Sequence, residues 1–140
     1  WMVPPNSAYL PQVPRLFSES LAANIALGRT ELPLDDIIAL TTLDQDLAQM
    51  PDGAATRVGA RGLRLSGGQA QRVAAARSLL TTPELLLIDD VSSALDVATE
   101  LDLWNRLREQ GRSTIIAVSH RQLAFELADE VITMRDGRIA

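Results

Sequence analysis

Apolar and polar positions follow two kinds of pattern along the chain. Residues 85–88 are four consecutive apolar positions closed by two aspartates, and a short apolar run of this kind indicates a buried strand. Residues 67–80 place Ala, Val and Leu among Gln and Arg, which is typical of a helix closed by the Thr-Thr-Pro that follows. The same criteria predict strands over 7–12, 114–118 and 131–134, and helices over 20–27, 34–43, 44–50, 97–110 and 122–128.

The order of these elements predicts the fold class. From residue 85 onward, three strands alternate with two helices as βαβαβ, which predicts an α/β fold with a parallel sheet and covering helices. Asp136-Gly137 is a hairpin signal, and Arg138-Ile139 would begin the return strand.

Two short segments are candidates for chemistry. Ser66 can cap the helix that starts at Gly67 and Gly68, whose lack of a Cβ lets backbone N–H groups approach an anion. The positive end of the helix dipole then points at phosphate. Asp89 and Asp90 end a strand at the carboxyl edge of the sheet, where open α/β sheets bind ligands. The two segments together predict a site for a magnesium-bound nucleotide.

The amino-acid composition excludes several classes of partner and binding site. The 140 residues carry a net charge of −5 with no basic stripe, so nucleic acid is not expected as a partner. The absence of Cys excludes disulfides and thiolate metal sites. Every basic residue is Arg, so the Lys of a phosphate-binding P-loop is not in this chain. The opening Trp1–Pro5 has no signal-peptide character, and we expect a domain fragment whose P-loop half lies upstream.

These motifs, in this order and spacing, resemble the ATP-binding-cassette (ABC) family over nearly the whole chain. The resemblance implies a P-loop NTPase-like parallel sheet with a helical signature subdomain, with the N-terminal strands missing. Residues 1–140 would be a partial nucleotide-binding domain, with the helical subdomain over about 16–80 and the C-terminal part of the ATPase core over about 81–140.

The resemblance assigns ligand-binding roles to residues 66–69, which match the signature motif of the family. In the family this segment closes over the γ-phosphate of an ATP held by the P-loop of the opposite subunit. That role falls here to Ser66, Gly67, Gly68 and Gln69. The competing interpretation is an ordinary turn before a helix.

The two aspartates take the positions of the family's magnesium and catalytic carboxylates. Asp89 would hold Mg²⁺ through water, as a hard-oxygen ligand suits that cation, unless it merely caps the following turn. Asp90 stands where the family has a Glu that polarises the attacking water. Because Asp is one methylene shorter, its oxygen is displaced by roughly 1 to 1.5 Å, which predicts slow hydrolysis or ATP-driven clamping.

Three further side chains match family motifs. His120 follows the strand 114–118 at the position of the switch histidine that contacts γ-phosphate, although a lone His is more often structural. Gln12 matches the glutamine that senses Mg²⁺ and water, and otherwise would be a solvated loop residue. Asp96 closes the segment 92–96, which resembles the D-loop at the dimer interface and would also cap the helix 97–110.

Two loops resemble those of exporters. Leu16-Phe17-Ser18 ahead of Leu21–Ile25 matches an exporter pattern, although Phe17 is equally suited to an ordinary core. Residues 56–62 resemble the loop that touches the membrane domain, with Arg57 and Ala60 at positions that are often acidic.

The resemblance therefore implies ATP binding and hydrolysis that powers transport of an unknown substrate at the cytoplasmic face of the cell membrane. ATP and Mg²⁺ would be the cofactors, and a second nucleotide-binding domain and a transmembrane domain the partners. Two alternatives stay open. One is a soluble cassette ATPase that acts on ribosomes or DNA, and the other is a catalytically weak subunit of a heterodimer.

Overall fold

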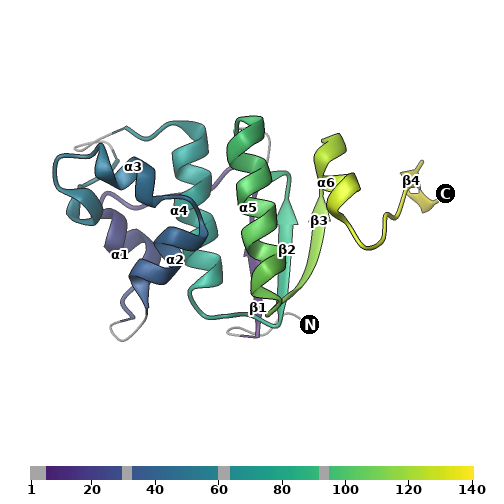
Figure 1. The fold of residues 1–140 in the computed structure, drawn as a ribbon, viewed down its shortest axis with the longest axis horizontal. Helices are drawn as coiled ribbons and strands as arrows, with labels where there is room; N and C mark the ends of the chain where they lie inside the picture. Colours follow the sequence, from purple (N-terminus) through teal and green to yellow (C-terminus); the bar gives the residue numbers. More distant parts are fainter. Residues whose placement is uncertain (1–5, 30–32, 60–63, 92–94) are drawn as a thin grey trace.

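The structure, a computed structural model, describes residues 6–29, 33–59, 64–91 and 95–140. Figure 1 shows the elements in chain order. They are β1 (Ser7–Leu10), α1 (Leu21–Ala26), α2 (Leu34–Leu40), α3 (Asp44–Ala48), the 3₁₀ helix η1 (Gly53–Ala55), α4 (Gly67–Leu79), β2 (Leu85–Asp89), α5 (Val97–Gln110), β3 (Thr114–Val118), α6 (Gln122–Leu127), β4 (Met134–Arg135) and β5 (Arg138–Ile139).

The main sheet has three parallel strands in the order β1-β2-β3. Leu10 lies opposite Ile88, which in turn lies opposite Ala117. The carboxyl ends of the three strands therefore meet at one edge of the sheet. This confirms the predicted parallel sheet and places the residues after each strand side by side.

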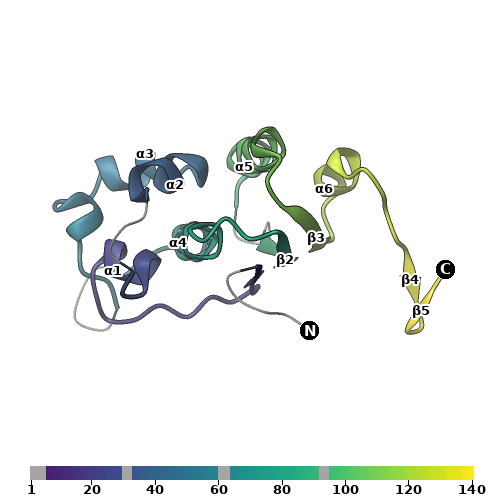
Figure 2. The ribbon, with the colours of Figure 1, turned by 90° about the horizontal axis from the view of Figure 1, so that it is seen from below.

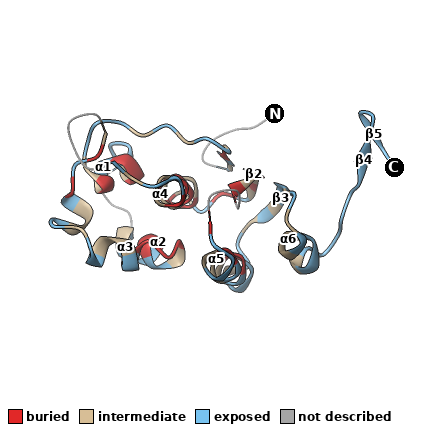
Figure 3. Cartoon of the chain, turned by 90° about the horizontal axis from the view of Figure 1, so that it is seen from above, coloured by how far each residue is buried: buried red, intermediate tan, exposed pale blue. Residues whose placement is uncertain are grey.

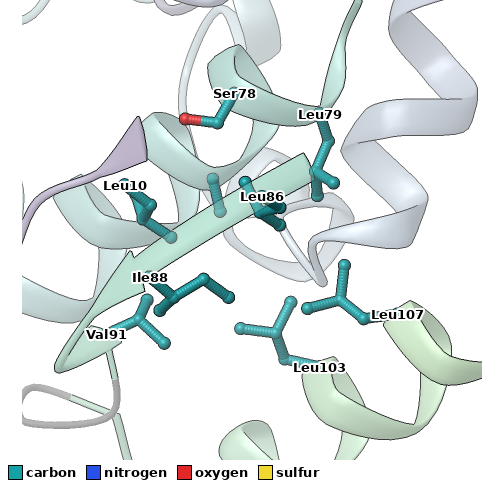
Figure 4. A pocket seen from close by; sticks show the side chains of 9 residues that line it. Leu10, Ser78, Leu79, Leu86, Ile88, Val91, Leu103 and Leu107 are labelled. Atoms are coloured by element: carbon teal, nitrogen blue, oxygen red, sulfur yellow. The ribbon is translucent and has the colours of Figure 1, made fainter. Parts of the chain in front are cut away.

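Helices α4 and α5 cover one face of this sheet (Figure 2). Side chains from both helices and from β1 and β2 surround an apolar void of only about 10 Å³. A void of this size and character is too small for a ligand and is expected to stay dry. The labelled apolar side chains point toward one another across it (Figure 4). The lining residues are Leu10, Ala75, Ser78, Leu79, Leu86, Ile88, Val91, Leu103 and Leu107.

A helical layer of α1, α2 and α3 packs beside α4, on the side away from α6 (Figures 1 and 2). Ser20 caps α1 by accepting a hydrogen bond from Ala23 N. Helix α2 ends earlier than predicted, at Leu40. Its end is fixed by Thr41, whose hydroxyl donates to the Ile37 carbonyl oxygen, and by Thr42, which has a positive φ of 56°.

Burial falls sharply toward the C-terminus. Figure 3 shows buried residues in α1, α2, α4, β2 and α5, whereas α6 and the β4–β5 hairpin are exposed or intermediate. The hairpin signal at Asp136-Gly137 is confirmed, because β4 and β5 pair antiparallel around it.

The predicted strand over 131–134 is wrong. Residues 131–133 form no strand, and Met134 belongs to the separate two-stranded sheet with β5. The apolar run here was read as a third parallel strand, but a strand needs a neighbour for its backbone groups. Val131 and Ile132 are 52% and 63% exposed, and among the described residues only β5 pairs with this part of the chain.

Candidate functional site

The sheet edge brings together two of the predicted carboxylates and two side chains from β1 and the loop after it. The phenol of Tyr9 donates a hydrogen bond of 2.9 Å to Asp89 Oδ2. The pKa of Tyr9 is raised above its ordinary value. The main cause is this hydrogen bond, and slight burial and the negative charge of Asp89 contribute less. The bond fixes one of the two carboxylate oxygens of Asp89.

Asp90 has an unusual backbone. Its φ is +48°, and its amide donates to the carbonyl oxygen of Val118 on β3 at 2.9 Å. Aspartate tolerates the left-handed region better than most residues, yet such conformations are strained and gather at functional sites. Gln12 Nε2 donates to Asp90 Oδ2 at 3.0 Å. Two predicted site residues from different strands are therefore joined directly.

His120 lies two residues beyond the end of β3, at the same edge of the sheet. Its side chain is exposed, and no hydrogen bond or ion pair links it to another described residue. The structure thus places His120 near the edge by topology, without fixing its imidazole.

The signature forms the start of α4. The hydroxyl of Ser66 accepts from Gln69 N at 3.2 Å, and Gln69 Oε1 accepts from Ser66 N at 2.9 Å, a complete capping box. The backbone amides of Gly67 and Gly68 have no acceptor among the described residues. Gly67 is exposed and Gly68 is buried, so Ser66 and Gly67 form the accessible end of the helix.

Gln69, predicted as a ligand-binding residue, has both polar atoms of its side-chain amide bonded within the chain. Its Oε1 is taken by Ser66 N, and its Nε2 donates to Asp46 Oδ1 of α3 at 3.1 Å. The amide therefore serves the geometry of the helix end with both of its polar atoms.

The segment before α5 is described only from Leu95 onward, so residues 92–94 of the predicted D-loop lie outside the described residues. Asp96 caps α5 by accepting from Thr99 N at 3.0 Å and Thr99 Oγ1 at 2.7 Å. The hydroxyl and then the amide of Thr99 hold the pKa of Asp96 below its usual range. The capping role of Asp96 is confirmed.

An ion pair lies between this segment and the residue after His120. Arg121 Nη1 is 3.5 Å from Oε2 of the buried Glu100, and Arg121 Nη2 donates to the Leu95 carbonyl oxygen at 3.1 Å. Arg121, which follows the predicted switch histidine, is thus tied to Leu95 in the segment that resembles the D-loop and to Glu100 in α5.

Helix α4 also holds the loop that follows β1. Gln71 Nε2 donates to the Gln12 carbonyl oxygen at 3.1 Å, and Arg77 Nη1 donates to the Arg15 carbonyl oxygen at 3.0 Å. Arg77 Nε reaches the Asn24 carbonyl oxygen at 2.8 Å. Phe17 packs against Arg77 through its ring but is 59% exposed, so the expectation of an ordinary core aromatic is not met.

The donor set at the sheet edge suits Mg²⁺. Asp89 and Asp90 offer carboxylate oxygens, and Mg²⁺ is commonly held by one or two carboxylates with water and substrate phosphate. In the described part of the chain no cluster of three or more acidic or histidine side chains surrounds a cation position. Two carboxylates at this edge of the sheet fit a cation that is also bound by the phosphates of a nucleotide.

Two contacts at the site involve residues to which the sequence motifs give no role, namely Tyr9, Asp46 and Arg72. Tyr9 lies on the same face of the sheet as Asp89, because Tyr9 pairs with Leu87 in the parallel register. Once that register is known, the alternation of side chains indicates the contact. Asp46 and Arg72 lie far apart in sequence, and no periodicity connects them.

None of the described helices is long and apolar enough to cross a membrane.

Comparisons with known proteins agree with the motifs. The family model for ABC transporters matches residues 2–93. The chain is 42% identical over 137 residues to the multidrug resistance-like ATP-binding protein MdlA of Escherichia coli, covering 95% of the chain and 23% of MdlA. It is 40% identical over 137 residues to the probable multidrug resistance ABC transporter ATP-binding/permease protein YheI of Bacillus subtilis, covering 94% of the chain and 23% of YheI.

A solved structure gives the same result. The structure of a bacterial Atm1-family ABC exporter with ATP bound superposes with a TM-score of 0.86 at 36% identity, over 96% of this chain and 24% of that one. The chain therefore spans about a quarter of the length of these relatives.

Proposed function

This chain belongs to the ABC transporter family, and we propose that it is part of a nucleotide-binding domain that binds and hydrolyses ATP to power transport across a membrane. Residues of about 16–80 form its helical subdomain, and residues of about 81–140 the C-terminal part of its ATPase core. The P-loop comes from another segment of the whole protein, since this chain contains no Lys. The relatives named as export or permease proteins support this function.

The observation that carries the proposal is the convergence at the sheet edge. Gln12 and Asp90 are hydrogen-bonded, and Asp89 sits one residue before Asp90 with one oxygen held by Tyr9. Carboxylates held in this way at the carboxyl edge of parallel strands are suited to a phosphate-bound cation. Mg²⁺, when bound, would neutralise part of the phosphate charge.

Each side chain then has a distinct task. Asp90 accepts a proton from, or orients, the water that attacks the γ-phosphate, and Gln12 keeps its carboxylate in place. Asp89 presents its remaining oxygen toward the cation and its waters. His120 contacts the γ-phosphate from the end of β3.

The signature end serves a second nucleotide-binding domain. Ser66 and Gly67 form an accessible helix N-terminus with a favourable dipole, where the amide of Gly67 has no acceptor among the described residues. In a head-to-tail dimer, they complete the site of the neighbouring domain, and Asp96 lies at the interface. A transmembrane domain joins the assembly at the cytoplasmic face of the membrane, where the exposed Phe17 is available for contact.

The proposal is tested at Asp90 in the whole protein. Asp90→Asn should lower the steady-state ATPase rate by about 10²-fold or more, because an amide cannot accept the proton or carry the charge. Asp90→Glu should preserve or raise the rate, since the longer side chain reaches further toward the water. Equal rates for the unchanged protein and both variants would show that Asp90 takes no part in the chemistry.

A further inference from the structure

The start of α4 is tied to a neighbouring helix by one carboxylate. Asp46, on α3, accepts from Gln69 Nε2 with Oδ1 at 3.1 Å. Its Oδ2 accepts from Arg72 Nε at 2.9 Å and Arg72 Nη2 at 2.5 Å. Gln69 and Arg72 are three residues apart and so share a face of α4. Both oxygens of Asp46 are therefore bound to the first two turns of the signature helix.

These bonds are partly shielded from water. The side chains of Arg72 and Asp46 are 12% and 16% exposed, respectively. Charge-assisted bonds from the fork of an arginine to a carboxylate are shorter and more directional than neutral ones. A shielded pair of this kind defines geometry more than it adds stability.

Asp46 itself is anchored. Leu43, directly before α3, is fully buried, and Leu47 packs against the core cluster. Leu43 N donates to the Ile38 carbonyl oxygen at 3.0 Å, which ties the start of α3 to α2. The carboxylate is thus a fixed point to which the helix end is attached.

Two successive hydrogen bonds connect Asp46 to Ser66 in the signature. Asp46 holds Nε2 of Gln69, and Gln69 Oε1 in turn holds the backbone amide of Ser66. Rotation of the Gln69 side-chain amide would break both bonds together and leave the capping box with only the bond from Gln69 N to Ser66 Oγ. The orientation of Ser66 therefore depends on Asp46 through a single intermediate side chain.

We propose that Asp46 is a positioning residue for the signature: through Gln69 and Arg72 it sets the direction in which Ser66 and Gly67 face the γ-phosphate of the neighbouring domain. This inference rests on the proposed function. It adds to it a residue of the helical subdomain that contacts no nucleotide, and it gives Gln69 a structural task in place of a ligand contact.

The test uses Asp46→Asn in the whole protein, with Asp44→Asn as the matched control. Asp44 lies on the same short helix and is exposed, and neither variant opens the apolar core, because Asp46 borders a polar cavity of about 370 Å³. Arg72→Lys is the second variant, since lysine keeps the charge but cannot donate to Asp46 Oδ2 from two nitrogens as the guanidinium does. Ser66→Arg is examined in parallel. The measurements are ATPase turnover, ADP affinity by isothermal titration, and the melting temperature.

A positioning role affects turnover alone. Asp46→Asn should lower kcat on the order of 10-fold, because misplacement of a reacting group by about 1 Å costs up to about 10²-fold. Arg72→Lys should cause a smaller loss, and Asp44→Asn none. ADP lacks the γ-phosphate that the signature meets, so its affinity should not change in any variant. If Asp46→Asn does not fold, the kcat and the ADP affinity of Arg72→Lys test the positioning role instead.

Two results would overturn the inference while leaving the proposed function intact. One is an unchanged kcat in Asp46→Asn and Arg72→Lys when Ser66→Arg abolishes turnover. The other is an equal loss of turnover and ADP affinity, which would indicate a general structural role. Full turnover in Ser66→Arg would instead overturn the proposed function itself.

Discussion

The chain up to the end of α5 and the chain from β3 onward differ in packing. Among the described residues, the buried apolar core runs from Leu10 to Leu107 and includes nothing later. Ile116 and Val118 on β3 are each 57% exposed. The first region thus buries its own apolar residues, while the second leaves comparable residues in contact with solvent.

The same division separates the functional side chains. The side chains of Asp89, Gln12 and Ser66 in the first region are each hydrogen-bonded to another described residue. His120 in the second region is exposed and has no such bond within the part of the chain that the structure describes. The described residues therefore orient the carboxylates of Asp89 and Asp90 and the hydroxyl of Ser66. Exposed apolar residues such as Ile116 are typical of contact surfaces, and in the whole protein we expect further sequence to cover them.

The largest expected effect compares one strand residue from each region. Leu86→Ala should lower the free energy of unfolding of this 140-residue chain by about 2–5 kcal/mol, because Leu86 is 1% exposed in the core. Ile116→Ala should cost less than about 1 kcal/mol, since its side chain is largely in water. Urea unfolding followed by circular dichroism measures both.

Equal losses of unfolding free energy for Leu86→Ala and Ile116→Ala in the 140-residue chain would contradict the difference in packing between the two regions. Repeating the two substitutions in the whole protein sharpens it. There, a cost for Ile116→Ala that rises to about 2 kcal/mol would show that other sequence covers β3.

A smaller effect concerns the bond between Tyr9 and Asp89. Tyr9 is the only tyrosine, so the ultraviolet absorbance of phenolate reports its titration alone. Its pKa should lie above 10.0 and fall toward that value in Asp89→Asn, which removes the carboxylate that favours the protonated phenol. Asp90→Asn is the control and should shift it less, because Gln12, and not Tyr9, donates to Asp90.

The raised pKa also fixes the sign of a pH dependence. The folded chain holds the phenol proton more tightly than the unfolded chain does. The stability from this bond is therefore fully present below pH 10 and is lost as the pH rises through the raised pKa of Tyr9. An ordinary pKa for Tyr9 that does not respond to Asp89→Asn would contradict the contact.

Local signals were sufficient for part of this structure. The helix cap at Ser66, the apolar run before Asp89 and the cap at Asp96 are each set by neighbouring residues, and the sequence predicts them correctly. The strand over 131–134 was mispredicted because its formation depends on a neighbouring strand, which local pattern cannot show.

The site itself was predictable only in outline. The resemblance to the family indicated Gln12 and Asp90, but their hydrogen bond follows from the parallel register of β1 and β2. Asp46 accepts hydrogen bonds from Gln69 and Arg72, which lie 23 and 26 positions further along the chain. No sequence pattern connects these residues. Such contacts arise from the packing of α3 on α4 and are found only in three dimensions.

The central claim is that the signature of this chain completes the nucleotide site of another domain. The direct test is ATPase activity of mixed dimers of the whole protein that carry Ser66→Arg and a P-loop Lys→Ala substitution. In one arrangement both lesions are in the same chain, and in the other each chain carries one. A dimer with the P-loop lesion alone sets the activity of a single intact site.

If Ser66 acts on the neighbouring site, splitting the lesions between the chains gathers them in one composite site and leaves the other whole. Placing both in one chain damages both sites. We therefore predict activity equal to that of the P-loop control when the lesions are split, and none when they are together. Activity that survives with both lesions in one chain and vanishes when they are split would contradict the role of Ser66 in the neighbouring site.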